Sequence, residues 1–481
     1  MKIFYAMPFT GKTYEKLVEE RSRILNTAKS FGLDVIEQFI GIEQKEGFEN
    51  HSYGPLFIAE KDHSLIKESD LLIADFENHS IGRDCELIMA KEILDKRVIS
   101  IVPDSYMKNH PWVRLYSDYI VSNQNEAFEL ALKLSQFTLS SQMSQLSREA
   151  KDKIDLQITE LLKNQKLSAI LELLPTELKR RWQILFGQEY QTIIEYSFKE
   201  LPKTLRINTL KTDVQKFFEI SSNYSWKLTP LEISPTAFRL STGNKFIFDE
   251  IPEHREGLFY VQELASMLPS IAIDPNPGER ILDIAAAPGS KTTHMAQLME
   301  NKGEILANDI SSERLEKLKN IVERLGVKNV KCHLGDGATL GDTYTESFDK
   351  VMVDGPCSNE GIIRYKSHKF FEWTLLQTYK LIKVQKNLLE SGFKALKPRG
   401  ILIYSTCTYA PEENEAVIDY LLGKYPSADV VPIRFKSIKT RSGLTKWEHL
   451  NFIERVTNTV RIYPQDNNSI GFFIAKIVKQ Y

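Results

Sequence analysis

The chain is poor in cysteine and has no long hydrophobic run. Its 481 residues include four cysteines, and these form no CxxC pair and no cluster with histidine. This spacing indicates neither a disulfide framework nor a zinc module, so we expect no metal. No apolar run approaches the roughly 20 residues that cross a bilayer, which argues against a membrane role.

Export signals are also lacking. The first residues, "MKIFYAMPFTGK", have no basic start, apolar stretch or small-residue cleavage site of the kind that marks a signal peptide. We therefore predict a cytoplasmic protein. The 42% hydrophobic and 26% charged residues are typical of a soluble globular chain, and a length of 481 residues predicts roughly two to four domains.

Charge is distributed unevenly around a formal net charge of −2. Residues 1–135 carry 16 basic and 22 acidic side chains, whereas residues 136–481 carry 46 basic and 42 acidic ones. The acidic first part argues against a nucleic-acid surface there, and the remainder permits one.

Strand-like and helix-like stretches divide the chain into four parts. Residues 1–137 alternate between the two, which predicts a parallel sheet covered by helices, as in a flavodoxin-like α/β domain. The Ser-rich stretch 138–151 predicts a linker. Residues 152–270 have helical spacing followed by short strands, which indicates a small mixed α/β module. Residues 271–481 return to α/β alternation and predict a Rossmann-like, doubly wound sheet.

In this last part, chemically active residues follow the predicted strands. The loops contain, in order, Asp283 with "AAAPGSK", Asp309, Asp336, "DGPC" and "STC". Ligands bind at the carboxyl ends of strands in such sheets, small residues let a ligand approach a helix N-terminus, and a carboxylate can accept hydrogen bonds from a ribose. A nucleoside-bearing cofactor fits, although each aspartate alone could be a helix cap or a turn residue.

Eight ordered blocks between residues 200 and 480 resemble the Sun/NSUN (RsmB-like) family of S-adenosylmethionine-dependent RNA cytosine-5 methyltransferases. They are "LRINTLK", "GLFYVQELASMLPS", "DIAAAPGSKTTHMA", "NDIS..R", "GDG", "DGPCSNEGIIR", "STCTYAPEENE" and "RIYPQDNNSIGFF". The resemblance implies a class I methyltransferase domain at 271–481, S-adenosylmethionine as cofactor and RNA as partner, with tRNA favoured over rRNA.

The resemblance also implies roles for particular residues. Cys407 would be the nucleophile, Cys357 a second thiol that helps to release the methylated product, and Asp354 would lie between cofactor and base. Asp309 would hold the ribose with Arg314 nearby. Asp336 would meet the adenine. The methionine end of the cofactor would lie against Ala285, Ala286, Ala287, Pro288, Gly289, Ser290 and Lys291.

The chemistry accounts for these residue types. Carbon 5 of cytosine is a poor nucleophile until a thiolate, here Cys407, attacks carbon 6 while Asp354 donates a proton at ring nitrogen 3. The base must be single-stranded or flipped out of a stack. Cys332, on an apolar strand, is expected to be a packing residue.

Four positions depart from the family pattern. Ala285 stands where many members have cysteine, and Gly355, Asn359 and Glu360 turn the commoner "DAPCSGxG" into "DGPCSNEG". The last three lie beside the reactive loop and leave the RNA substrate open.

RNA contact outside the pocket is expected from residues 152–270 and from "RFKSIKTRSGLTKW", which we call the basic segment. Basic side chains interleaved with aromatic ones suit phosphate contact and base stacking, although a solvated loop is the alternative. The segment contains Arg434, Phe435, Lys436, Lys439, Arg441, Lys446 and Trp447.

Residues 1–137 resemble the nucleoside 2-deoxyribosyltransferase-like fold, which includes nucleotide N-glycosidases, through "FYAMPFTGK", "SDLLIADFENHSIGRDCELIMA" and "RVISIVP". The resemblance implies that Glu86, four residues after Gly82, attacks the sugar, that Asp75 contacts base or sugar, and that Ser80 accepts a phosphate. It implies a nucleotide ligand and permits self-association through residues 1–137. The alternatives are a surface carboxylate for Glu86 and a turn cap for Asp75.

The primary hypothesis is therefore an RNA cytosine-5 methyltransferase with an accessory N-terminal domain. Two alternatives stay open at this point. One is a non-catalytic RNA-binding or ribosome-assembly factor that retains cofactor affinity. The other is a nucleotide N-glycosidase with an RNA-binding appendage.

Overall fold

A computed structural model describes most of the chain. The described residues are 2–7, 13–37, 55–76, 86–94, 96–103, 108, 110–135, 148–163, 167–224, 226–242 and 248–481. They form two compact units. Unit 1 comprises residues 1–190 and 366–376, and unit 2 comprises residues 191–365 and 377–481.

This division differs from the boundaries expected from composition. Helix α8 (Arg148–Lys163) begins inside the predicted linker, so residues 148–151, the last four of that linker, are helical. Residues 138–147 lie outside the described part. Helices α9 (Leu167–Leu173) and α10 (Thr176–Phe186) also belong to unit 1. The expected boundary fell at the most polar stretch, whereas the buried faces of these helices pack within unit 1.

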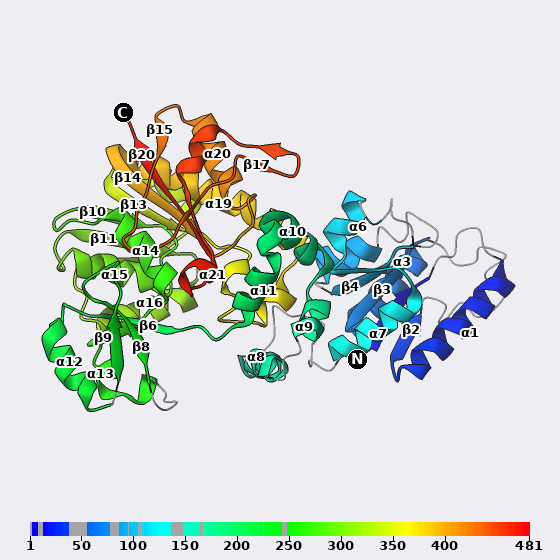
Figure 1. The fold of residues 1–481 in the computed structure, drawn as a ribbon. Coiled ribbons are helices and arrows are strands. Elements are labelled where there is room, and N and C mark those ends of the chain that lie inside the picture. The colour runs from blue at the N-terminus through cyan, green and yellow to red at the C-terminus, as the bar shows by residue number, and fades with distance from the viewer. Residues whose placement is uncertain are drawn as a thin grey trace. The chain divides into compact units, whose positions relative to one another are not determined.

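Unit 1 is built on a five-stranded parallel sheet in the order β2-β1-β3-β4-β5 (Figure 1). Every residue of β3 and β4 is buried, as expected when helices cover both faces of a parallel sheet. The strands are β1 (Lys2–Ala6), β2 (Asp34–Glu37), β3 (Leu71–Asp75), β4 (Arg97–Ile101) and β5 (Tyr119–Val121). The helices beside them include α1 (Tyr14–Ser30), α3 (Pro55–Glu68), α6 (Pro111–Tyr116) and α7 (Gln124–Ser135).

A short segment from far along the chain, residues 366–376 with helix α18 (Lys369–Glu372), completes unit 1. The Asp155 carboxylate accepts hydrogen bonds from the Ser367 hydroxyl at 2.7 Å and from the His368 backbone N–H at 2.7 Å. Arg97 donates to the carbonyl of Phe371 and lies against its ring. The pattern of residues 366–376 contains no signal for this placement, because its partners lie about 200 residues or more away in the sequence.

Unit 2 begins with a small antiparallel sheet in the order β7-β8-β6-β9. Its core contains Phe217 from helix α12 (Val214–Ser222) and Phe259 from β9, whose ring centroids lie 5.4 Å apart. The strands are β6 (Lys203–Ile207), β7 (Lys227–Pro230), β8 (Ala237–Ser241) and β9 (Phe259–Val261). Helices α11 (Tyr190–Phe198) and α14 (Leu264–Ile273) flank it in the sequence, and α13 (Pro252–Arg255) lies between β8 and β9.

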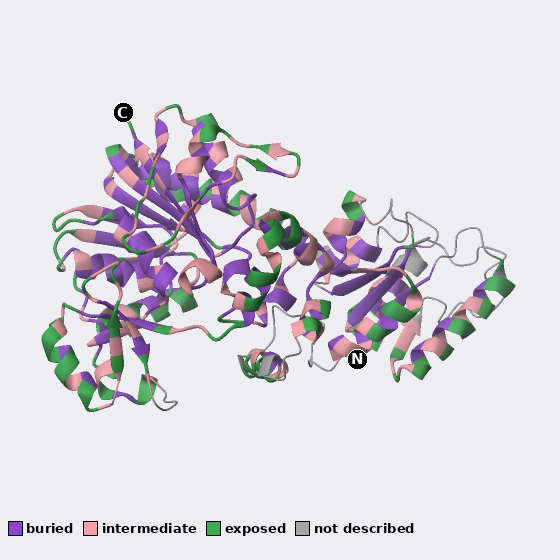
Figure 2. Ribbon diagram, in the orientation of Figure 1, coloured by how far each residue is buried: buried purple, intermediate pink, exposed green. Residues whose placement is uncertain are grey.

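The second sheet of unit 2 has the order β12-β11-β10-β13-β14-β20-β19-β16, with β15 (Ala428–Val431) paired to β20. Strands β10, β11, β13 and β20 are buried along most of their length (Figure 2), whereas β12 and β16 are not. Strands β10 to β14 are parallel and β20 is antiparallel. The strands are β10 (Arg280–Asp283), β11 (Glu304–Asp309), β12 (Val330–Leu334), β13 (Phe348–Asp354), β14 (Leu396–Thr406), β16 (Arg441–Ser442), β19 (Val460–Ile462) and β20 (Phe472–Lys479). The predicted Rossmann-like, doubly wound sheet is confirmed.

Helices α15 (Ser290–Leu298), α16 (Ser312–Arg324), α19 (Leu375–Ala395) and α20 (Glu415–Lys424) connect these strands. Chain order reverses between β10 and β13, and the loops that follow the two strands leave from the same sheet edge. On adjacent β13 and β14, Asp354 pairs with Ser405. The loops "GPCSNEG" and "CTY" therefore start side by side.

Candidate active site

Two cysteine side chains meet where β13 and β14 end. The Cys357 and Cys407 sulfur atoms lie 3.3 Å apart, with Cys357 buried and Cys407 half-buried. The backbone N–H of Gly361 donates to the Cys407 carbonyl at 2.8 Å and thereby joins the two loops. A Cβ atom on Gly361 would lie 2.3 Å from the carbonyl oxygen of Gly471, so this close approach requires glycine.

The two thiols have different surroundings. The hydrogen bond with Cys407, burial and the nearby Glu413 carboxyl together raise the pKa of Cys357 well above its ordinary value. Burial raises the pKa of Glu413 itself to about 7. Cys357 is therefore a neutral thiol at neutral pH, and the more exposed Cys407 is the sulfur that a ligand can reach.

Asp354 ends β13 beside these thiols. Its Oδ2 accepts a hydrogen bond from the Lys291 ammonium at 2.6 Å, and its Oδ1 accepts one from the Ser405 hydroxyl at 2.7 Å. The Lys291 side chain is 9% exposed and that of Asp354 31% exposed, so the carboxylate faces the open side of the pair. A cation and a hydroxyl thus hold the carboxyl group in one orientation.

The loop from 285 to 290 runs into the N-terminus of α15, where Gly289 has a φ of 109°. Asp283, at the end of β10, is buried, and its Oδ2 accepts from the Thr292 hydroxyl at 2.6 Å. Among the described residues, no partner faces its other oxygen, Oδ1. Burial raises the pKa of Asp283 to about 7. An orphaned buried carboxyl oxygen here suits a ligand with a cationic group.

Asp309 is tied to the same loop. Its carboxylate accepts hydrogen bonds from the backbone N–H groups of Ala287 at 3.2 Å and Ser311 at 3.0 Å. Arg314 pairs with this carboxylate at 3.4 Å and donates to the Ala287 carbonyl. Asp336, two residues beyond β12, is exposed and accepts a hydrogen bond from the Ala338 N–H at 2.9 Å. It therefore caps the short helical turn that follows, which is the alternative role that the sequence left open for each aspartate.

Asp283, Asp309 and Asp336 lie at or just beyond the carboxyl ends of β10, β11 and β12, which are neighbours in the sheet. A row of hydrogen-bond acceptors beside a helix N-terminus lined by small residues fits a nucleoside with an amino-acid tail. The cofactor residues predicted from the sequence, from Ala285 to Asp336, therefore gather at one sheet edge with Asp354 and the thiols.

Sequence reasoning assigned no role to several polar groups around the thiols. Gln385 on α19 donates to the Pro356 carbonyl at 2.8 Å and to Glu413 at 2.7 Å. Asn359 contacts both sulfur atoms through its amide oxygen. Only Asn359 had a sequence signal, as a departure from the commoner "DAPCSGxG". Gln385 lies 28 residues before Glu413, in a helix whose pattern indicates only packing.

Residues 270–478 match the family model described as 16S rRNA methyltransferase RsmB/F. Residues 174–264 match the model described as the N-terminal domain of 16S rRNA methyltransferase RsmF. The chain belongs to the RsmB/F family. The sequence prediction of an RNA cytosine-5 methyltransferase is thereby confirmed.

Two curated relatives and one solved structure illustrate this membership. The tRNA (cytosine(49)-C(5))-methyltransferase of Pyrococcus abyssi is 40% identical over 59% of this chain and 90% of its own length. Ribosomal RNA small subunit methyltransferase F of Escherichia coli is 37% identical over 58% of each chain, so this chain spans little more than half of that relative. NSun6 from Pyrococcus horikoshii, solved with SFG, is 25% identical over 64% of this chain and 98% of its own, with a TM-score of 0.56.

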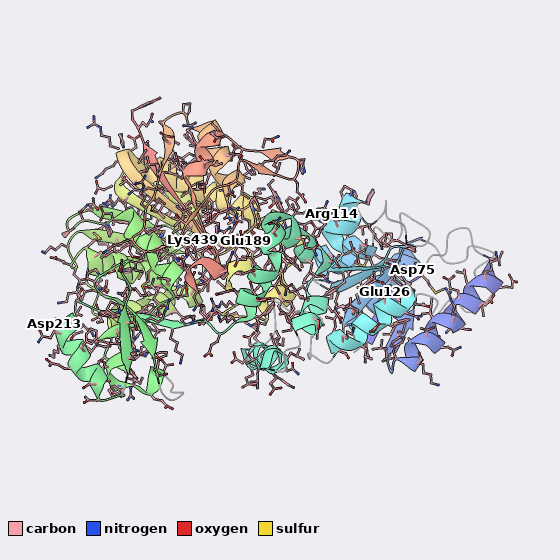
Figure 3. All side chains as sticks on the ribbon, in the orientation of Figure 1. Asp75, Arg114, Glu126, Glu189, Asp213 and Lys439 are labelled. Carbon is pink, nitrogen blue, oxygen red and sulfur yellow. The ribbon has the colours of Figure 1, made fainter. Side chains whose placement is uncertain are left out.

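In the RsmB/F part, the basic segment differs from its prediction. Trp447, in the short strand β17 (Lys446–Trp447), is buried and its indole N–H donates to Glu412 at 2.9 Å, so the prediction that it stacks on RNA bases is wrong. Lys439, labelled in Figure 3, and Arg441 both pair with the Asp466 carboxylate at 2.7 Å. Phe435 is half-buried against the core. The exposed cations are Arg434, Lys436, Lys439 and Lys446.

Outside the RsmB/F part, the N-terminal candidate residues are only partly described. Asp75 ends β3 and accepts a hydrogen bond from the Tyr5 hydroxyl at 3.0 Å. Glu86 is 8% exposed, so the surface-carboxylate alternative is wrong. Ser80, Gly82 and Cys85 lie outside the described residues.

Two further expectations concern Cys332 and membrane-spanning helices. Cys332, expected to be a packing residue, is half-buried on β12 and packs against the cluster that contains Leu315 and Leu318. Across the described residues, no helix has the length and apolar character needed to span a membrane.

Proposed function

We propose that the chain forms 5-methylcytosine in RNA through a covalent adduct between Cys407 and carbon 6 of the target base. The observation that carries this proposal is the meeting of two thiols, 3.3 Å apart, beside the Asp354–Lys291 pair at the carboxyl ends of adjacent strands. A methyltransferase that methylates an atom that is already nucleophilic needs no thiol. Carbon 5 of cytosine, by contrast, must first be activated.

Each residue has a defined task in this proposal. The Cys407 sulfur adds to carbon 6 while Asp354 delivers a proton to ring nitrogen 3, so that electron density moves to carbon 5. The Lys291 ammonium and the Ser405 hydroxyl orient the Asp354 carboxyl group. When bound, S-adenosylmethionine supplies an electrophilic methyl group for carbon 5. Its binding residues would be Asp283, the loop from Ala285 to Lys291, Asp309 with Arg314, and Asp336.

Cys357 acts at the end of the cycle. After methyl transfer, carbon 5 loses its proton to a base and the bond between carbon 6 and Cys407 breaks. The neutral Cys357 thiol, in contact with the Cys407 sulfur, donates a hydrogen bond to the departing thiolate and favours its release. The adduct should therefore persist when this thiol is removed.

We favour tRNA over rRNA as the substrate. The relative named as a tRNA methyltransferase is matched over 90% of its length, whereas the rRNA methyltransferase F relatives are matched over 58%. The cofactor assignment has support from the P. horikoshii NSun6 structure, because SFG is an analogue of S-adenosylmethionine.

A trapping experiment tests this proposal. The Cys357→Ala variant, expressed in cells and isolated under denaturing conditions, is expected to carry covalently attached RNA, and sequencing of that RNA identifies the cytosine. The Cys357→Ala/Cys407→Ala double variant is the control and should carry none. An adduct that survives in the double variant would contradict the role of Cys407, and the absence of any adduct and of methyl transfer would favour a non-catalytic RNA-binding factor.

Unit 1 is a second candidate for activity, as a nucleotide N-glycosidase or deoxyribosyltransferase. Its strand order is that of flavodoxin-like sheets, and Asp75 lies at the carboxyl end of β3 beside the switch between β1 and β3. Burial of the Glu86 side chain is unusual for a glutamate without a functional or structural task. Self-association through residues 1–137 stays a prediction.

For this second candidate, we expect wild-type protein to release free base from at least one member of a nucleotide panel. The Glu86→Gln change should abolish the release because it removes the attacking carboxylate. Chromatographic detection of the base measures it, and Glu126→Gln, at an exposed position of unit 1, is the matched control. A flat response across all nucleotides would retire the glycosidase proposal.

A further inference from the structure

Two buried polar side chains hold the backbone on both sides of Cys357. Gln385, on α19, donates through its Nε2 to the Pro356 carbonyl at 2.8 Å and to Oε2 of Glu413 at 2.7 Å. The same Oε2 accepts a hydrogen bond from the backbone N–H of Ser358 at 3.0 Å. We call Gln385 and Glu413 the brace. Neither of its side chains is exposed, so solvent does not compete for these bonds.

The brace fixes the direction in which the Cys357 side chain leaves the backbone. The Pro356 carbonyl belongs to the peptide group before Cys357, and the Ser358 N–H belongs to the peptide group after it. A residue has two soft backbone torsions, φ and ψ, which describe the rotation of its two flanking peptide groups. Because both groups are held, the Cα–Cβ bond of Cys357 is held as well. The thiol keeps only its rotation about χ1.

The brace also fixes the loop of Cys357 relative to the loop of Cys407. Glu413 lies six residues after Cys407 in the sequence. Its backbone carbonyl accepts a hydrogen bond at 2.6 Å from the hydroxyl of Tyr404, a buried residue of β14. Side chains from α19 and from the segment after β14 therefore set the 3.3 Å contact between the two sulfur atoms.

These two side chains are poorly suited to a purely stabilising role. The second oxygen of each, Oε1 of Gln385 and Oε1 of Glu413, is buried and has no partner among the described residues. Burial of an acceptor without a hydrogen bond lowers the stability of a fold. Two apolar side chains would avoid this cost but would leave the peptide groups beside Cys357 without an anchor. The arrangement therefore favours a geometric task at the thiol.

We propose that Gln385 and Glu413 are positioning residues for release of the methylated base. This inference rests on the proposed role of Cys357 in that step. The Cys357 thiol must lie against the Cys407 sulfur when the bond from that sulfur to carbon 6 breaks, because a hydrogen bond acts only over a short distance. The brace keeps the thiol there and takes no part in the attack by Cys407 or in methyl transfer.

The test compares wild type with Gln385→Met, which keeps the length of the side chain and removes its donor. Purified protein, in excess over total RNA from cells that lack this protein, receives S-adenosylmethionine with a labelled methyl group. The label in RNA measures the first turnover, and the protein–RNA adduct that survives denaturation is followed on a gel over time. The first turnover is expected to proceed at close to the wild-type rate. Decay of the adduct should slow by roughly 10- to 100-fold, the effect of a small misplacement of a reacting group.

Three further variants sharpen the comparison. Asn387→Met, at an exposed position on the same helix, is the matched control and should behave as wild type. Gln385→Asn keeps an amide but shortens the side chain by one methylene, so it should also slow release. Glu413→Gln retains an oxygen that can accept from Ser358 and Gln385, so its adduct should decay at close to the wild-type rate. An adduct of Glu413→Gln as persistent as that of Gln385→Met would overturn the proposal and make Glu413 a proton carrier.

A double variant separates positioning of Cys357 from damage elsewhere. Since the brace acts through the Cys357 thiol, adding Gln385→Met to Cys357→Ala should not slow decay of the adduct further. The proposal is overturned by a further slowing, by unchanged decay in Gln385→Met, or by a first turnover that falls as much as release in both Gln385 variants. Failure of the proposed function has a different signature, which is neither labelled RNA nor adduct with the wild-type protein, and the inference then falls with it.

Discussion

Cys407→Ala is expected to reduce methyl transfer to RNA by a factor on the order of 10³ or more. Loss of a covalent nucleophile removes the step that activates carbon 5, and catalytic nucleophiles have effects of this size or larger when removed. Transfer of a labelled methyl group from S-adenosylmethionine to total tRNA measures the change. Cofactor binding should persist, because the Cys407 sulfur lies with Cys357 and Asn359 and not in the row of carboxylates.

Cys332→Ala is the matched control for this variant. Cys332 is a half-buried thiol on β12 that packs against the cluster containing Leu315 and Leu318. Its replacement should leave the rate of methyl transfer close to that of wild type. Residual activity within tenfold of wild type in Cys407→Ala would exclude the covalent route. Equal losses in both variants would point to damaged folding.

Asp354→Asn is expected to lower kcat by roughly 10²- to 10⁴-fold, which is the range of general acid–base contributions. The amide keeps the volume of the carboxyl group and can still accept from Ser405, but it cannot deliver a proton to ring nitrogen 3. It also leaves the nearly buried Lys291 ammonium without its anionic partner. Single-turnover methyl transfer and calorimetric titration with S-adenosylmethionine measure chemistry and cofactor affinity separately.

Asp349→Asn provides the comparison on the same strand. Asp349 accepts from the Lys397 ammonium at 2.7 Å and from the Arg280 N–H at 2.8 Å, but it lies near the start of β13, away from the thiols. Both variants lose an ion pair with a lysine, although the Lys397 side chain is more exposed than that of Lys291, so a catalytic role predicts a large loss of kcat only for Asp354→Asn. A weaker cofactor affinity with unchanged kcat would show that Asp354 serves the cofactor and not the base.

Much of the site could be predicted because it is encoded in short stretches. Asp354 and Cys357 follow one buried apolar run and Cys407 follows another, and parallel strands deliver their ends to one edge. The orientation of Asn359 could not be predicted, because it depends on a hydrogen bond to the Cys357 carbonyl within a left-handed turn.

Errors arose where burial depends on distant partners. Trp447 stands among basic residues, which is typical of an RNA-binding surface, yet Glu412 from another part of the chain accepts its N–H inside the core. Glu86 belongs to a charged stretch and is buried nevertheless. Local composition records the average exposure of a segment and not that of one side chain.

The sequence by itself determined the class of fold in the second half, the family, and which side chains are candidates for the reaction. These properties depend on alternating apolar runs and on residues adjacent in the chain. Only the tertiary structure decided the contact of the two sulfur atoms, the acceptor that faces Cys407, and the inclusion of residues 366–376 in unit 1. Each of these requires packing between segments tens to hundreds of residues apart or a specific turn geometry, and neither leaves a periodic pattern in the sequence.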